Sequence, residues 1–562
     1  MASTPIGGQQ PKLFARQASG LIREFGFKDV FVFNTLGYAL GLVLAVTPFF
    51  AGSVFPGRNV LIVLVIGTIL AAFNGLTYGL LAGAMPRSGG EYVYNGRVLH
   101  PAIGFMTNWG FTWSQLLGIA IYVEWTVNQA ISISFSTIGY STGNKSLLDL
   151  GTWMAKPGHT FLIGTALLIT VILVQLAGMG FLKHFLNWFF IIAVAGSVVT
   201  FLVLVLHSRA DFISSFNIFM VKTSHLSNAY SGIIGQAKAA GWTYKTASWS
   251  QYIVALPLAY WMFIGFTYSA YIGGEVKEPS KTQSRAVLGS LLVGFVFYFV
   301  ILASYYHTVG TQFNDAAAFL QFNGKSPLPL AGALNFFAGV LTKNVFINSL
   351  IGVSFFLWYY LLLFVMFTII VRNMFAWSFD QIVPASLTKM TRGTHSPWAA
   401  ILVASVAIEV LLALFTFTSL FSYVYNYIVI FSVAFWFTSF AAILLPYRRR
   451  DLFEAAPPSI RRRVFGVPLV TIAGAINLVL FTLILYASFK LPAFSGPTGH
   501  WATVFVVAIY VIGLAIYFGV AGYKNRKGID LSLLYGEIPP EWPTFCQSRQ
   551  PFLAPGEGLT EG

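Results

Sequence analysis

The chain contains little charge and almost no cysteine. Charged residues make up 9% of its 562 residues, whereas roughly 25% is typical of soluble domains. Cys546 is the single cysteine, which excludes a disulfide within the chain. The sequence also lacks a Walker loop, a nucleophile elbow and any histidine-rich or paired-acid cluster. We therefore expect a membrane protein that is not an enzyme or an ATP-driven pump, with no cofactor and no metal.

Hydrophobic residues, by contrast, form 57% of the sequence and gather in long runs. About 20 apolar residues suffice to cross a bilayer as a helix, so these runs predict an all-α polytopic fold. Residues 1–26 are polar and basic, which argues against a secretory signal peptide. Twelve spans are expected, at roughly 28–54, 59–85, 101–138, 159–180, 184–207, 251–275, 284–309, 345–379, 397–417, 419–446, 466–489 and 501–523.

The positive charges favour one side of this topology. An even number of spans places both termini on the same side, and 23 of the 33 Lys and Arg residues then fall there. Because basic residues are retained in the cytoplasm, we predict a multi-pass plasma membrane protein with cytoplasmic termini. Orientation then accounts for most of the net charge of +15, so nucleic acid is not an expected partner. The arginine clusters at 448–450 and 461–463 serve either as orientation signals or as contacts for anionic headgroups.

Three segments outside the spans are long. Residues 208–250 are polar and are interpreted as an exposed outer loop. Residues 309–344 alternate apolar stretches with Gly and Pro, which predicts short helices over the outer mouth. The proline-rich tail, residues 524–562, is expected to be a disordered cytoplasmic end.

Two of the spans are poor helices at their centres. Residues 27–54 contain Gly37 and Gly41, and residues 251–281 contain Gly265 among further small residues. Glycine costs about 1 kcal/mol relative to alanine inside a helix. Glycines spaced by four also form packing stripes between membrane helices. Two interrupted spans at corresponding places in two halves are instead typical of a transporter's binding site, where broken helices expose backbone groups. We favour the second interpretation.

Three motifs give the chain a recognisable family likeness. Residues 85–94 read MPRSGGEYVY, residues 263–279 contain FIGFT followed by GGEVKEP, and residues 372–384 read RNMFAWSFDQIVP. Together, over about residues 22–450, they resemble amino acid permeases of the amino acid–polyamine–organocation (APC) superfamily. Any one motif is weak, whereas their joint occurrence in this order is specific.

The resemblance implies a particular fold. Members have two inverted five-helix repeats, as in LeuT-like transporters, so spans 1–5 would pair with spans 6–10. The expected organisation is a cytoplasmic segment at 1–26, a transport core at 27–446, two additional C-terminal helices with a basic linker at 447–523, and the tail at 524–562.

The resemblance also implies where the substrate binds. The break in span 1 offers N–H groups to a carboxylate, and the break in span 6 offers carbonyls to an ammonium, so an amino acid needs no charged side chain. The two breaks should face one cavity, with the Cα atoms of Gly37 and Gly265 within about 10–15 Å of each other. Trp261 takes the place of a gating aromatic residue. The implied substrate-binding residues are Leu36, Gly37, Tyr38, Ala39, Leu40, Gly41, Trp261, Ile264, Gly265 and Thr267.

One departure from the family bears on the substrate. Thr267 stands where some relatives that handle cationic substrates carry a glutamate. Its neutrality favours a secondary transporter of neutral amino acids working by alternating access. Two alternatives remain: a polyamine or organic-cation transporter of the same fold, and a receptor or partner subunit that moves nothing.

Candidates for coupling and gating are few. Span 5 lacks the lysine of several proton-coupled relatives, and residues 357–367 lack the Ser/Thr pair of sodium-coupled ones. Proton coupling, sodium coupling and exchange therefore all stay open. Glu124 is a candidate because an acid inside a membrane span is costly and often functional. Glu275 is expected to form a gating ion pair with Arg87 or Arg372 near the cytoplasmic surface.

Overall fold

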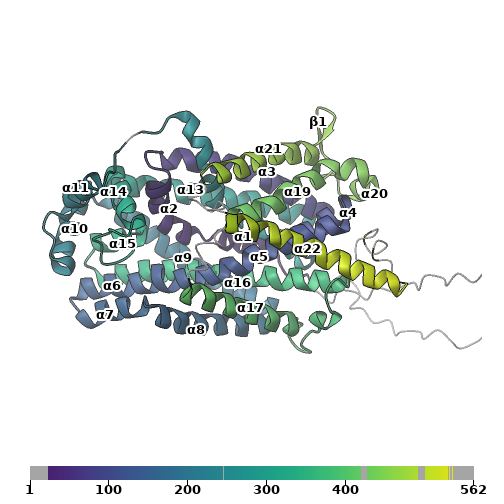
Figure 1. The fold of residues 1–562 in the computed structure, drawn as a ribbon, viewed down its shortest axis with the longest axis horizontal. Coiled ribbons are helices and arrows are strands. Elements are labelled where there is room, and N and C mark those ends of the chain that lie inside the picture. The colour runs from purple at the N-terminus through teal and green to yellow at the C-terminus, as the bar shows by residue number, and fades with distance from the viewer. Residues whose placement is uncertain are drawn as a thin grey trace, which may run out of the picture.

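The structure is a bundle of long α-helices that run along the longest axis of the molecule (Figure 1). This computed structural model describes residues 23–244, 246–418, 427–491, 500–528, Leu531 and Tyr535. Within these residues, eleven segments are helical, long and apolar enough to cross a membrane, which confirms the all-α polytopic class. They are α1 with α2 (Phe27–Gly37, Leu40–Val54), α3 (Val60–Ala84), α5 with η1 and α6 (Pro101–Trp125, Thr126–Ile131, Ser132–Thr142), α8 (Pro157–Leu176), α9 (Met179–Leu206), α13 (Pro279–Val309), α16 (Val345–Phe379), α17 (Trp398–Phe417), α19 (Tyr427–Arg448), α21 (Leu469–Lys490) and α22 (His500–Arg526).

The sixth predicted span, residues 251–275, is absent from this set because it contains no long helix. It is divided into η2 (Trp249–Ala255), α12 (Leu256–Trp261), η3 (Tyr268–Tyr271) and η4 (Gly273–Glu275). Further short elements include α4 (Glu91–Val98), α7 (Lys145–Met154), η5 (Ala385–Thr388), α20 (Arg450–Ala455) and a hairpin of β1 (Arg463–Val464) and β2 (Val467–Pro468).

One end of the bundle, called here the terminal end, is where α1 begins and α22 ends. Phe25 forms an isolated β-bridge with Val276, and Lys524 donates a hydrogen bond to Gln381 just after α16. The opposite end carries α10 (Arg209–Ser224), α11 (Ala229–Ala239), α14 (Thr311–Phe322) and α15 (Leu334–Leu341) (Figure 1).

The expectation that residues 208–250 form an exposed loop is wrong. Helices α10 and α11 occupy most of this segment. Phe212, Phe216 and Phe219 lie on one helical face of α10 and are buried. Phe212 and Phe216 each contact the rings of Phe313 and Phe337 in α14 and α15. The overall polarity of the segment concealed this aromatic face, whose burial stabilises the helix. The short helices predicted in residues 309–344 are present.

The expectation that the whole C-terminal tail is disordered is also wrong. Helix α22 continues to Arg526, and Tyr535 is only 3% exposed. The hydroxyls of Tyr535 and Tyr92 are 2.8 Å apart, and the guanidinium of Arg97 lies 4.7 Å from the centre of the Tyr535 ring. A buried cation therefore holds this aromatic residue against α4. Residues 536–562 lie outside the described part of the chain.

A buried ion pair joins α4 to the end of α16. Arg97 Nη2 lies 2.8 Å from Asp380 Oδ2, and their side chains are 1% and 2% exposed. The Tyr92 hydroxyl donates to the same carboxylate oxygen at 2.9 Å. Removing one member of such a pair leaves an uncompensated charge away from water, which is far more costly than losing an exposed pair.

We therefore expect Asp380→Asn to destabilise the protein by about 3–5 kcal/mol. The matched control is Glu454→Gln, which removes the partner of Arg450 in a pair whose side chains are 80% and 58% exposed, where about 0–1 kcal/mol is expected. Thermal unfolding of the purified full chain compares the two variants. Equal melting temperatures for Asp380→Asn and Glu454→Gln would contradict a structural role for the buried pair.

Candidate functional site

The first span is interrupted near its middle. Helix α1 ends at Gly37 and α2 begins at Leu40. Between them Ala39 has a φ of 44° and a ψ of 66°, a left-handed conformation that few non-glycine residues adopt. The Ala39 N–H donates to the Leu36 carbonyl at 3.0 Å before the helix resumes. The chain thus turns at the position where its glycines predict a break.

The interruption in the sixth span is longer. After α12 ends at Trp261, turns and 3₁₀ segments continue to Glu275. Gly265 has a φ of +107°, which an L side chain rarely adopts. Backbone groups freed by this break are bound by polar side chains of other spans. The Ser269 N–H donates to Asn34 Oδ1 at 2.8 Å, and Gln283 Nε2 donates to the Ser269 carbonyl at 3.0 Å.

The two breaks touch each other directly. A Cβ atom on Gly265 would lie 2.0 Å from the carbonyl oxygen of Gly37, and one on Gly37 would lie 2.4 Å from the carbonyl oxygen of Gly265. Both values are far below any normal contact, so neither position accepts a side chain in this arrangement. The two glycines therefore lie close together, as expected, but the ligand-sized space expected between them is filled by this contact. Without Cβ atoms the backbones approach to contact, and the cavity lies beside them.

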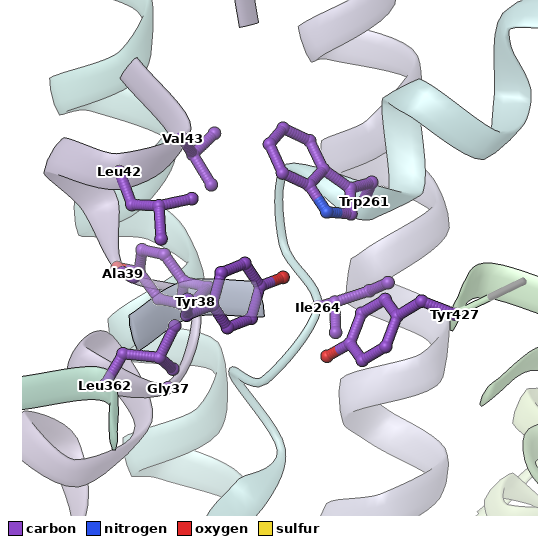
Figure 2. Close-up of a pocket in the computed structure, with 10 residues that line it drawn as sticks. Gly37, Tyr38, Ala39, Leu42, Val43, Trp261, Ile264, Leu362 and Tyr427 are labelled. Carbon is purple, nitrogen blue, oxygen red and sulfur yellow. The ribbon is translucent and has the colours of Figure 1, made fainter. Parts of the chain in front are cut away.

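A small pocket opens at the two breaks (Figure 2). Trp261, Ile264 and Tyr427 face Leu42 and Val43 across it. The volume open to the centre of a water molecule is about 10 Å³, enough for roughly one water. A larger ligand therefore needs these side chains to move. The lining consists of Gly37, Tyr38, Ala39, Leu42, Val43, Tyr122, Trp261, Ile264, Leu362 and Tyr427.

Half of the ten predicted binding residues line this pocket. Sequence reasoning missed five others, among them Tyr122, Leu362 and Tyr427 from spans 3, 8 and 10. Nothing in the sequence marks these three, because an apolar or aromatic residue is ordinary in a buried membrane helix. The predicted residues found in the lining are Gly37, Tyr38, Ala39, Trp261 and Ile264.

The other five predicted residues lie close by but outside the lining. A Cβ on Gly41 would lie 2.2 Å from Trp358 Cδ1, so Gly41 packs against α16. Leu36 and Leu40 are buried in the helix core, and Gly265 lies against Gly37. Thr267 is fully buried, and its Oγ1 has no hydrogen-bond partner among the described residues.

Helix ends supply the polarity of the pocket. Helix α2 starts beside it, and the first N–H groups of a helix lack partners and carry roughly half a positive charge. Helices α1 and α12 end beside it at Gly37 and Trp261, and carbonyl ends carry the opposite partial charge. No lining residue is charged. The arrangement suits a small zwitterion held by backbone groups.

Two acidic residues, the partly buried Glu124 and the fully buried Glu91, lie near these spans without lining the pocket. Glu124 accepts a hydrogen bond from Asn128 Nδ2 at 2.7 Å, and Asn128 accepts one from Thr160 in α8. Glu91, which sequence analysis did not single out, is fully buried and accepts from Asn108 Nδ2 at 2.8 Å. Burial raises the pKa of the Glu91 carboxyl to about 7. The feature of the sequence that could have identified Glu91 is its position directly after Gly89 and Gly90, between two predicted spans.

The gating candidates are brought together in part. Arg372 in α16 forms a buried, two-pronged ion pair with Glu275, with Nη2–Oε1 at 2.8 Å and Nε–Oε2 at 3.2 Å. Of the two partners predicted for Glu275, the structure therefore pairs it with Arg372. Arg87 lies against Gly273, and its Nη1 donates to the Pro86 carbonyl at 2.9 Å. The pair connects the end of the broken sixth span to α16.

Comparison with known proteins agrees with this architecture. The family model described as amino acid permease matches residues 26–516, which include both interrupted spans. The chain is also 24% identical over 390 residues to the Branched-chain amino acid permease BcaP of Bacillus subtilis (strain 168). That alignment covers 68% of this chain and 72% of the relative. The chain belongs to the amino acid permease family, as its three motifs indicated.

Proposed function

We propose that this protein is a secondary transporter that moves neutral amino acids with apolar side chains across the plasma membrane by alternating access. Membership of the amino acid permease family supports amino acid transport and points to a transporter and not an enzyme. The observation that carries the finer proposal is the pocket at the two breaks, whose ten lining residues include no charged side chain.

The lining favours neutral over cationic substrates. A second ammonium, on a basic amino acid or a polyamine, would leave water for a site that offers no carboxylate. Burying an unpaired charge is very costly. The zwitterionic part of an amino acid avoids this cost, because the opposed helix ends at α2 and α12 provide partial charges of both signs.

The apolar lining also favours branched aliphatic side chains. Leu42, Val43, Ile264 and Leu362 present hydrocarbon to the same space, and each buried CH₂ group contributes about 0.8 kcal/mol. The relative BcaP is named a branched-chain amino acid permease, which supports the same substrate class.

The orientation proposed from charge places the terminal end in the cytoplasm. The buried pair of Glu275 and Arg372 then lies between the pocket and the cytoplasm as part of an inner gate. No Asp, Glu, His, Lys or Arg lines the pocket, so uptake assays should impose proton and sodium gradients separately to identify the coupling.

The orientation can be tested with single cysteines in a Cys546→Ala background. Ser231 in α11 and Ser459, which follows α20, are both exposed, and α11 and α20 lie at opposite ends of the bundle (Figure 1). We expect a membrane-impermeant maleimide, applied to intact cells, to label Ser231→Cys and to label Ser459→Cys only after permeabilisation. The opposite pattern would reverse the proposed orientation.

The broken-helix site predicts that Gly265→Val abolishes transport. A β-branched residue disfavours the positive φ at Gly265 and collides with the Gly37 carbonyl. The assay is initial-rate uptake of labelled leucine into proteoliposomes, normalised to folded protein. The matched control is Gly519→Val in α22, where an added Cβ meets no atom within 4 Å, and near-normal uptake is expected. Wild-type rates for Gly265→Val would refute the site.

The substrate class predicts a size-dependent effect of Ile264→Ala. Shortening this side chain removes hydrocarbon that would contact a large substrate but not a small one. We expect KM for leucine to rise about tenfold or more, while KM for alanine changes little. Val479→Ala in α21, an exposed position outside the pocket, serves as the control. Parallel changes for leucine and alanine would argue against contact between Ile264 and the substrate side chain.

A further inference from the structure

The hairpin between α20 and α21 presents a fully exposed aromatic ring. Its strands pair Arg463 with Pro468 and Val464 with Val467, leaving Phe465 and Gly466 as a two-residue turn. Phe465 is 102% exposed, the highest value among the exposed large hydrophobic residues of the described chain. In Figure 1 the hairpin projects from the side of the bundle. The ring thus gains nothing from packing within the protein.

The turn also holds this phenylalanine in an unfavourable backbone conformation. Phe465 has a φ of 50° and Gly466 a φ of 81°, the positive pair typical of a type I′ turn. Asn, Asp or Gly usually occupies the first position, because a bulky L residue is disfavoured there. The hairpin is nevertheless closed by a hydrogen bond from the Leu469 N–H to the Arg462 carbonyl at 2.8 Å. No contact of the ring within the described protein offsets this strain. The strain therefore points to a role in contacting something outside the protein.

Positive charge without acidic partners surrounds the ring. Arg461, Arg462 and Arg463 are all exposed, and no described carboxylate forms an ion pair with them. Residues 455–490 contain no Asp or Glu. The neighbouring basic pair is different: Arg449 binds Asp451 at 2.7 Å, and Arg450 binds Glu454. The hairpin therefore combines three uncompensated guanidinium groups with one exposed apolar ring.

The hairpin lies where a membrane span begins. Phe465 precedes Leu469, the first residue of α21, by four positions, which a chain covers in at most about 14 Å. Ile460, just before the arginines, packs against Gly83 near the end of α3. The short distance between Phe465 and the start of α21 places the hairpin tip within reach of the headgroup layer that borders the hydrocarbon core.

We propose that the β1–β2 hairpin binds anionic phospholipids of the leaflet at the terminal end. Phe465 enters the boundary between headgroups and acyl chains, and Arg461, Arg462 and Arg463 bind phosphate and carboxylate oxygens of the headgroups. Arginine suits this role because its planar fork donates two parallel hydrogen bonds to such groups. Basic clusters beside a membrane span attract anionic lipid in the same way, and aromatic residues prefer the interfacial layer. This lipid site is separate from the substrate pocket.

The insertion of the tip is tested with Phe465→Cys in a Cys546→Ser background. The full chain carries an NBD fluorophore at position 465 and is placed in nanodiscs containing acyl-chain doxyl-labelled lipid. We expect stronger quenching in discs of phosphatidylcholine with one fifth phosphatidylserine than in phosphatidylcholine alone, and weaker quenching at high salt. Equal quenching in the two compositions overturns the proposal. An increase in shielding of the label with protein concentration in detergent would also overturn the proposal, because a second copy of the chain would then be the partner of the hairpin.

The role of the charges is tested by two matched double variants. Arg461→Gln/Arg462→Gln removes unpaired arginines, whereas Arg449→Gln/Arg450→Gln removes two that already have acidic partners. Binding of fluorescent phosphatidylserine to the full chain in detergent is the readout. We expect the first variant to bind about thirtyfold more weakly, because it loses two basic residues that attract anionic lipid, and the second to change binding much less. Equal losses in both variants, or no loss in the first, contradict a specific role for the hairpin.

Discussion

The contact between the backbones of Gly37 and Gly265 is the constraint on which the site depends. A chain inside a bilayer must give every backbone polar group a partner, so two unwound segments at membrane depth are tolerated only when protein surrounds them. Here each break lies against the other. Asn34, one turn before the first break, also binds the Ser269 N–H of the second. The first and sixth spans therefore stabilise each other's irregular conformation.

This arrangement explains how the proposed site for a zwitterionic amino acid can exist in a chain so poor in charge. Helix ends at the breaks provide partial charges of both signs, and the lining itself remains neutral and largely apolar. The full charges are used elsewhere. Two buried ion pairs, Glu275 with Arg372 and Arg97 with Asp380, join α16 to its neighbours at the terminal end. The arginines of the β-hairpin, which pair with no described carboxylate, are exposed, and we propose that they contact lipid.

Sequence patterns failed where burial depended on one face of a polar segment. The aromatic residues Phe212, Phe216 and Phe219 turn part of residues 208–250 into a helix, although the average composition suggests a loop. Tyr535 is buried in a proline-rich tail because Arg97 offers it a partner. Both outcomes depend on residues more than 90 positions away, which local composition cannot represent.

The sequence by itself determined the membrane class, eleven of the spans, the two interrupted segments and the family, because apolar length, glycine placement and motifs are local properties of the chain. Only the tertiary structure decided that the breaks touch, that Arg372 is the partner of Glu275, and that Tyr122, Leu362 and Tyr427 complete the pocket. These features arise where distant helices pack together. The physical reason is that the partner of a side chain in the bundle is set by the packing of whole helices, and a local sequence pattern does not specify that packing.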